Sequence, residues 1–208
     1  MTELACTPGQ TVGPFFGLAL PYAGGSSLVS QAHPDAVTLH GAVYDGAGHA
    51  VPDALVELWQ PDSAGRIVRQ AGSLRRAGSG FTGWGRAATD ADGRYAFTTV
   101  TPCVASRRKS TRHDGRAGAF ASARPGKVPF FAIAVFARGL LNRLFTRAYL
   151  PDGELDADPL LSSIDPRRRA TLLCAAENGY RFDIHLQGPN ETVFLTFHDD
   201  LDDPGGPR

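Results

Sequence analysis

Cysteine is scarce in this chain, which has only Cys6, Cys103 and Cys174. The three are odd in number, lie far apart and form no C-x-x-C pair, so neither a disulfide framework nor a structural zinc site is expected. Reduced, isolated cysteines are typical of the cytoplasm, and the sequence therefore predicts a cytoplasmic protein.

Uninterrupted apolar runs are also missing. Residues 4–34 carry no Asp, Glu, Lys or Arg, but glycine and proline interrupt this stretch too often for a membrane-spanning helix. The first seven residues contain no Lys or Arg, unlike the start of a secretory signal peptide. We interpret residues 1–34 as an irregular N-terminal arm and expect no membrane partner.

An excess of charge of either sign is absent as well. The 208 residues include 21 basic and 21 acidic side chains, so no overall field attracts nucleic acid or an anionic membrane. Glycine (24) and proline (15) make up roughly one residue in five, which excludes a helical bundle and favours many turns. Hydrophobic residues (42%) suffice for a core, and we expect a single domain over residues 1–208.

Short strand-like segments between glycine-rich turns predict an antiparallel β-sandwich over residues 35–200. The strands are expected at residues 37–44, 54–60, 95–100, 128–137, 144–150, 180–186 and 193–197. One helix is predicted, with Asp165 as its N-cap and Pro166 as its first residue, ending at Asn178-Gly179.

Residues 103–127 differ from the rest of the chain, because they contain seven basic residues and a single acid, Asp114. They show neither strand nor helix periodicity and predict a long, exposed and atypical basic loop. Apart from Phe120 no aromatic residue accompanies these charges, so nucleic-acid binding is not expected. On composition and spacing alone, the chain is a soluble β-rich domain without an obvious active site of its own.

Four segments, in chain order, resemble motifs of the intradiol ring-cleaving dioxygenases. They are residues 7–16 (TPGQTVGPFF), the core from residue 40 to 66, residues 83–97 with TDADGRYAF at their end, and residues 180–184 (YRFDI). The resemblance implies an antiparallel β-sandwich with irregular arms. It also implies O₂-dependent cleavage of a catechol between its hydroxyl carbons at a non-haem Fe(III).

The family holds its ferric ion with two tyrosines and two histidines, and none of these ligands is found here. The resemblance places the first tyrosine at Ile67, the second near Cys103-Val104, and the histidines at Phe130 and Ala132. These side chains do not supply the family's ligands, so the chain is not expected to bind catalytic iron or to be active alone.

Such an absence fits the non-iron α chain of a hetero-oligomeric family member. Residues 136–147 (FARGLLNRLFTR) and 187–194 (QGPNETVF) resemble segments of those α chains. The resemblance implies a β-chain partner that carries the Fe(III), a small aromatic substrate and O₂. The expected reaction converts 3,4-dihydroxybenzoate to 3-carboxy-cis,cis-muconate.

By the same match, Thr11, Gly13, Pro14 and Arg138 line the substrate pocket at the interface between the two chains. Gly13-Pro14 would let the backbone approach a ring closely, and Arg138 could bind a carboxylate with two parallel hydrogen bonds. Plainer interpretations stay open: a rigid turn for Gly13-Pro14, and a surface or interchain ion pair for Arg138.

Two other functions stay open for a chain with these residues. A stand-alone intradiol dioxygenase for another catechol would need the missing ligands, and a non-enzymatic transthyretin-like or carbohydrate-binding sandwich would have no need of the N-terminal motif. One departure from the α-chain pattern is the sequence PFFA at residues 129–132, where P-H-I-N is usual. We interpret residues 103–131 as a diverged loop or as the product of compensating frameshifts.

Overall fold

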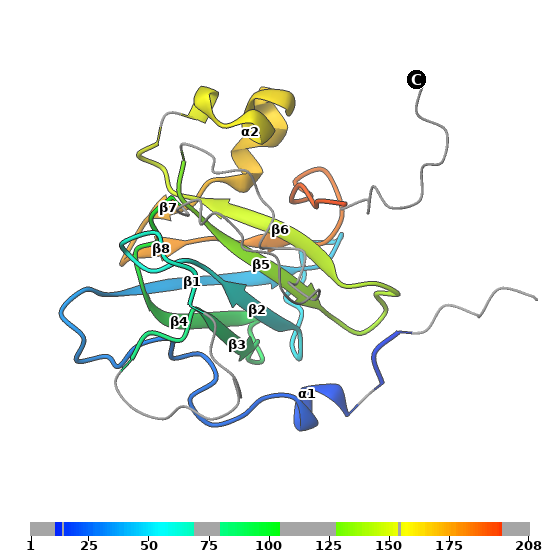
Figure 1. Ribbon diagram of the computed structural model, residues 1–208. Coiled ribbons are helices and arrows are strands. Elements are labelled where there is room, and N and C mark those ends of the chain that lie inside the picture. Colours follow the sequence, from blue (N-terminus) through cyan, green and yellow to red (C-terminus); the bar gives the residue numbers. More distant parts are fainter. Residues whose placement is uncertain (1–10, 14, 69–79, 105–127, 154, 197–208) are drawn as a thin grey trace, which may run out of the picture.

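Two β-sheets packed against each other form the protein in the computed structural model, which describes residues 11–13, 15–68, 80–104, 128–153 and 155–196 (Figure 1). One sheet contains β1 (Ala36–Tyr44), β4 (Arg94–Val100), β7 (Ala175–Ala176), β8 (Tyr180–Arg181) and β9 (Ile184–His185). The other contains β2 (Leu55–Trp59), β3 (Trp84–Ala88), β5 (Phe130–Phe136) and β6 (Leu144–Tyr149).

The helices are short and lie outside the sandwich. They are α1 (Phe16–Ala19), α2 (Pro159–Ser163) and α3 (Pro166–Arg169), with 3₁₀ turns η1 (Leu155–Ala157) and η2 (Ala170–Leu172). In Figure 1, α1 belongs to the arm below the sheets, and α2 lies at the opposite end of the molecule. Within the described residues, no helix has the length and apolarity that crossing a membrane requires.

The strand predictions for five segments are confirmed as β1, β2, β4, β5 and β6. The sheet β3-β2-β5-β6 is antiparallel throughout, as expected. The other sheet, in the order β4-β1-β8-β7, is mixed, because β8 and β9 both run parallel to β1. The short strand β3 was not predicted.

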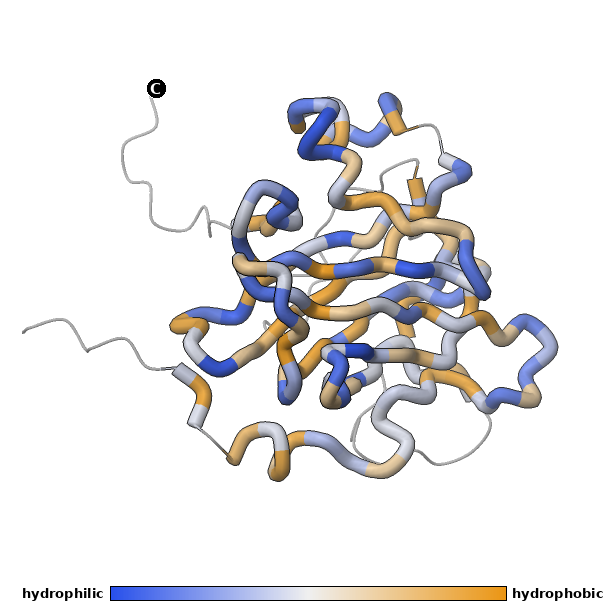
Figure 2. Tube along the Cα trace, turned by 180° about the vertical axis from the view of Figure 1, so that it is seen from behind, coloured by the Kyte–Doolittle hydropathy of each residue, from blue (hydrophilic) through white to orange (hydrophobic). Residues whose placement is uncertain are grey.

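Alternate residues of the facing strands fill the core between the sheets. Leu39 and Phe97 from one sheet pack in the same cluster as Leu58 and Ile133 from the other, and all four are at most 1% exposed. Burying a side chain of this size contributes about 1.5–3 kcal/mol. Figure 2 shows that apolar residues also occur in the arm, along the outside of the sandwich.

The helix predicted from Asp165 to Asn178-Gly179 is much shorter than expected. Asp165 does cap a helix, since its carboxylate accepts the Arg167 N–H at 2.9 Å, and Pro166 is the first residue. The helix α3 nevertheless ends at Arg169, and the chain becomes extended because Cys174 donates its N–H to the Tyr149 carbonyl at 2.9 Å. Pairing with β6 therefore replaces further helical turns.

The strand predicted at residues 180–186 divides into β8 and β9. Between them, the Asp183 carboxylate accepts the Ala42 N–H at 3.0 Å, so a side chain replaces the backbone acceptor there. Phe182 and Ile184 of this segment are buried. Residues 193–196, predicted as part of a closing strand, lie beside β6 without forming one, although Leu195 donates to the Phe145 carbonyl at 2.7 Å.

Candidate functional site

The N-terminal arm is fastened to the edge strand β3. The Arg86 N–H donates to the Gly25 carbonyl at 2.8 Å, and its guanidinium donates to the Leu20 carbonyl at 3.0 Å. The ring of Tyr22 stacks on Trp84, with ring centroids 6.1 Å apart. These contacts fix the course of the arm along β3, on the outside of the sandwich.

The start of the described arm contacts the turn that follows β5. The Gly139 N–H donates to the Thr11 hydroxyl oxygen at 2.9 Å. Gly139 has a φ of +90°, a backbone conformation that favours glycine. A residue of the predicted pocket, Thr11, is thereby joined to the neighbour of another, Arg138.

Arg138 itself forms an ion pair with Asp53. Its Nη2 lies 2.9 Å from the Asp53 Oδ2, and both side chains are slightly more than half exposed. Such an exposed pair contributes little to stability, so its importance lies in where it directs the guanidinium. The interpretation of Arg138 as a surface ion-pair residue is compatible with this contact, which occurs within one chain.

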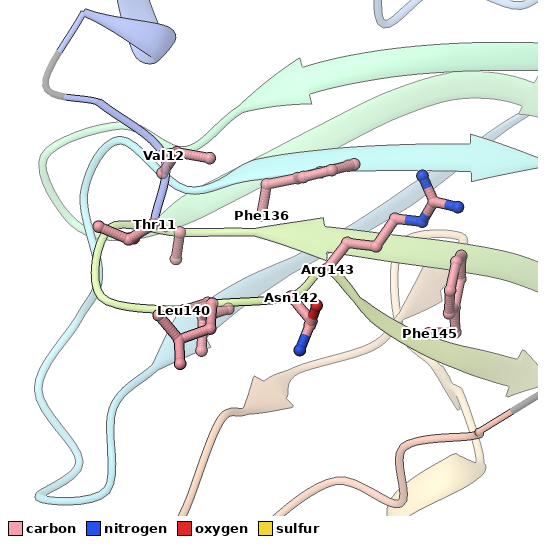
Figure 3. A pocket seen from close by; sticks show the side chains of 9 residues that line it. Thr11, Val12, Phe136, Leu140, Asn142, Arg143 and Phe145 are labelled. Atoms are coloured by element: carbon pink, nitrogen blue, oxygen red, sulfur yellow. The ribbon is translucent and has the colours of Figure 1, made fainter. Parts of the chain in front are cut away.

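An open groove of about 620 Å³ lies between the arm and the β5–β6 hairpin (Figure 3). Its walls are mostly apolar, with Asn142 and Arg143 at one side and the Arg143 guanidinium 4.8 Å from the centroid of the Phe145 ring. The lining residues are Thr11, Val12, Phe136, Ala137, Leu140, Leu141, Asn142, Arg143 and Phe145.

Thr11 and Arg138 are brought into one region, but the predicted pocket residues that the structure describes do not all line this groove. Thr11 lines it, whereas Gly13 is exposed nearby and its carbonyl accepts the Phe16 N–H at 3.2 Å. Arg138 follows Ala137 at the end of β5, outside the lining set. Pro14 lies outside the described residues. The roles of these four residues in a substrate pocket stay a prediction.

Sequence reasoning missed Asp53 and the groove residues after Gly139. Asp53 has a φ of +64°, and it follows Pro52 in the pattern of a turn whose third residue needs positive φ. Aspartate tolerates that conformation better than most residues, so the Pro-Asp pair was a readable turn signal. Its contact with Arg138, 85 positions away, had no local signal.

The positions where the resemblance places the metal ligands hold neither a tyrosine nor a histidine. Phe130 and Ala132 lie two residues apart on β5, opposite Tyr149 and Arg147 of β6. Ile67 is 48% exposed and offers only hydrocarbon. Cys103, also exposed, uses its backbone N–H to bind the Asp62 carbonyl at 3.3 Å.

Tyr149, which lies opposite Phe130, has a phenol that is already occupied by other side chains. Burial raises the pKa of Tyr149 to about 12, and its hydroxyl lies between the Arg147 Nη1 at 3.0 Å and the Asp158 Oδ1 at 3.3 Å. Within the described ranges, no three His, Cys, Asp or Glu side chains lie together as a metal site would require. The residues that the structure describes therefore do not fit a ferric ion.

Comparisons with known proteins identify the family that this chain resembles. The model of a protein family described as Dioxygenase matches residues 13–188. The protocatechuate 3,4-dioxygenase alpha chain of Burkholderia cepacia is 38% identical, over 94% of this chain and 99% of its own length. The beta chain from the same organism is 31% identical, over 75% of this chain and 66% of its own length.

A solved structure shows the same fold. The dioxygenase domain of a carbohydrate-binding fusion protein from Streptomyces sp. SirexAA-E superimposes with a TM-score of 0.54 and 25% sequence identity. The match covers 88% of this chain and 98% of that domain. The β-sandwich predicted from the sequence is therefore confirmed.

Proposed function

This chain belongs to the dioxygenase family, and on that premise we propose that it is the α subunit of a protocatechuate 3,4-dioxygenase. The complex would cleave 3,4-dihydroxybenzoate with O₂, between the two hydroxyl carbons, to give 3-carboxy-cis,cis-muconate. The observation that carries this proposal is a likeness to an alpha chain over nearly the full length of both proteins. The chain is not expected to be active alone.

We infer that a partner supplies the iron chemistry. The resemblance places metal ligands at Ile67, Phe130 and Ala132, which offer none, so a β chain is expected to hold the Fe(III) in a cytoplasmic hetero-oligomer. The likeness of this chain to a beta chain supports two subunits of related fold. A stand-alone dioxygenase would need the donors that these positions lack. A non-enzymatic sandwich is disfavoured by the alpha-chain likeness.

We assign the residues of this chain a role in forming the substrate pocket. Thr11, Gly13 and Pro14 of the arm would form part of its wall, and Arg138 would bind the carboxylate of the substrate. The hydrogen bond between the Gly139 N–H and Thr11 supports a common site for the arm and Arg138. Arginine binds carboxylates with two parallel N–H donors, and Asp53 is its only partner among the described residues.

Iron content and visible absorption test whether the β chain, and not this chain, holds the Fe(III). The chain would be purified alone and after co-expression with its candidate β chain. We expect an iron-free, colourless protein alone, and a complex with red tyrosinate-to-Fe(III) absorption that cleaves 3,4-dihydroxybenzoate. Stoichiometric ferric iron in the lone chain would show that it is an enzyme by itself. A chain that forms no complex and binds no iron would point to a binding module.

A further inference from the structure

We propose that Asp53 is a positioning residue that orients the Arg138 guanidinium toward the carboxylate of the substrate. The inference rests on the proposed function, in which Arg138 lines the substrate pocket. It starts from the 2.9 Å contact between the Asp53 Oδ2 and the Arg138 Nη2. Asp53 belongs to the turn before β2 and Arg138 to the turn after β5. These two strands are antiparallel neighbours, so the two turns meet at the same end of the sheet.

The turn that carries Asp53 is held on both sides. The Thr89 hydroxyl donates to the Val51 carbonyl at 2.8 Å and accepts the Ala54 N–H at 2.8 Å. Ala54 is fully buried, and Thr89 is only 7% exposed. The φ of +64° at Asp53 is a conformation that recurs at functional sites when the surroundings enforce it. The carboxylate therefore starts from a fixed backbone.

Arg138 needs such a partner because its own surroundings leave it free. It lies beyond the end of β5, and 57% of its side chain is exposed. A long side chain in this setting samples many rotamers unless a contact selects one. Asp53 engages Nη2, and among the described residues the other donors of the planar guanidinium have no partner and can bind a second carboxylate.

The N-terminal arm meets the same pair. A Cβ atom added at Gly17 would lie 3.6 Å from the Asp53 Cβ, so the arm passes close to Asp53. On the other side of the turn, Gly139 donates its N–H to Thr11. Asp53 thus lies where the arm, its own turn and Arg138 come together, and its loss would loosen Arg138 relative to the arm.

The contact between Asp53 and Arg138 should affect which class of catechol the complex prefers. An oriented guanidinium favours catechols that carry a carboxylate over catechol itself, which offers Arg138 no anionic group. Removing the Asp53 oxygens would therefore raise the KM for 3,4-dihydroxybenzoate, while the cleavage of unsubstituted catechol would change little. The kcat should change little, because Arg138 would bind the carboxylate and not the carbons between which the ring is cleaved.

The test uses the complex with the β chain and compares both substrates. Asp53→Gly tolerates the positive φ and removes the acceptor, and we expect a KM for 3,4-dihydroxybenzoate about five-fold higher. Asp53→Asn tolerates the same φ and keeps an acceptor oxygen, so most of the selectivity should be recovered. Asp53→Ala removes the same oxygens without adding backbone freedom, and it replaces the glycine variant if that chain does not assemble.

Two controls separate this inference from the proposed function. Asp156→Ala removes an acid that pairs with Arg169 near α2, beyond the opposite end of β5 and β6, and should leave both KM values unchanged. Arg138→Ala should raise the KM for 3,4-dihydroxybenzoate, and Asp53→Gly should add nothing to it. An Arg138→Ala complex with normal kinetics would overturn the pocket role itself. A normal or lowered KM in Asp53→Gly, with an impaired Arg138→Ala, would overturn the positioning role alone.

Discussion

Arg147 lies over the ring of Phe130, with its guanidinium carbon 4.3 Å from the ring centroid. The resemblance places a histidine ligand at Phe130, and the neighbouring strand β6 places the permanent cation of Arg147 beside this residue. A guanidinium does not lose its proton in proteins, so it opposes the approach of a ferric ion. A metal ion at this position would therefore lack a histidine ligand and would also meet the positive charge of Arg147.

Arg147 also begins a chain of hydrogen bonds that runs through Tyr149 to Asp158. Its Nη1 donates to the Tyr149 hydroxyl, which donates in turn to the Asp158 carboxylate. Asp158 also accepts the N–H groups of Leu160 and Leu161 and so caps α2. The same polar side chains therefore attach α2 to β6, which gives the region a structural role in place of metal binding.

Restoring the two histidines should not restore an iron site. In Phe130→His/Ala132→His, two imidazoles would be present, but the positions where the resemblance places the tyrosinates hold Ile67 and Cys103-Val104. Tyr149 is engaged with Arg147 and Asp158. Ferric iron needs hard anionic oxygen ligands, and Arg147 repels it. We expect no stoichiometric iron by metal analysis and no visible absorption band. Phe130→Leu/Ala132→Ser serves as the matched control for folding, and one iron per double-histidine chain would contradict the prediction.

Alkaline conditions should destabilise the protein. Burial raises the pKa of the Tyr149 phenol and of the Cys174 thiol to about 12 each, above the usual values near 10 and 8.5. Above about pH 9 the unfolded chain therefore binds fewer protons than the folded chain, and stability falls until both groups have ionised near pH 12. Below pH 8 their contribution is fully present.

Urea unfolding of the wild type and of Tyr149→Phe between pH 8 and pH 11.5 tests the share of Tyr149. At pH 8 the variant should be less stable by about 1–2 kcal/mol, because the hydroxyl joins Arg147 and Asp158. This difference should shrink as the pH rises toward 12. A difference that stays constant over the whole range would show that Tyr149 does not titrate with unfolding.

Gly41 should not tolerate any side chain. A Cβ atom there would overlap the carbonyl of Phe182, which accepts the Tyr95 hydroxyl at 2.6 Å on the same segment. Gly41→Ala would push the β8–β9 segment away from β1, and we expect a loss of at least about 3 kcal/mol, measured by urea unfolding. Gly80→Ala is the control, since no atom lies within 4 Å of its added Cβ. Equal stabilities of the two variants would contradict this account.

The sequence predicted the long strands well because their signals are local. β1, β4, β5 and β6 contain apolar or aromatic residues with the right alternation, and turns flank them. β3 was missed because its sequence, WGRAA, has no β-branched residue and it is a strand only through pairing with β2.

The predicted helix shows the opposite failure. Asp165 and Pro166 are true start signals, but nothing nearby in sequence reveals that Cys174 will pair with Tyr149. For the site, the motif match brought Thr11 and Arg138 into one region. The contact of Arg138 with Asp53 depends on two turns far apart in the chain, which only the fold brings together.

The hydroxyl of Thr11 joins the arm to the turn after β5, and its removal should affect the substrate pocket. Thr11→Val keeps the shape of the side chain but cannot accept the Gly139 N–H. Since Thr11 is exposed, the stability of the chain should change by less than about 0.5 kcal/mol. In the complex, the arm would lose its fixed distance from Arg138, and the KM for 3,4-dihydroxybenzoate should rise by about two- to five-fold. Thr11→Ser, which keeps the hydroxyl, should behave like the wild type. A normal KM in Thr11→Val would show that this hydrogen bond does not shape the substrate pocket.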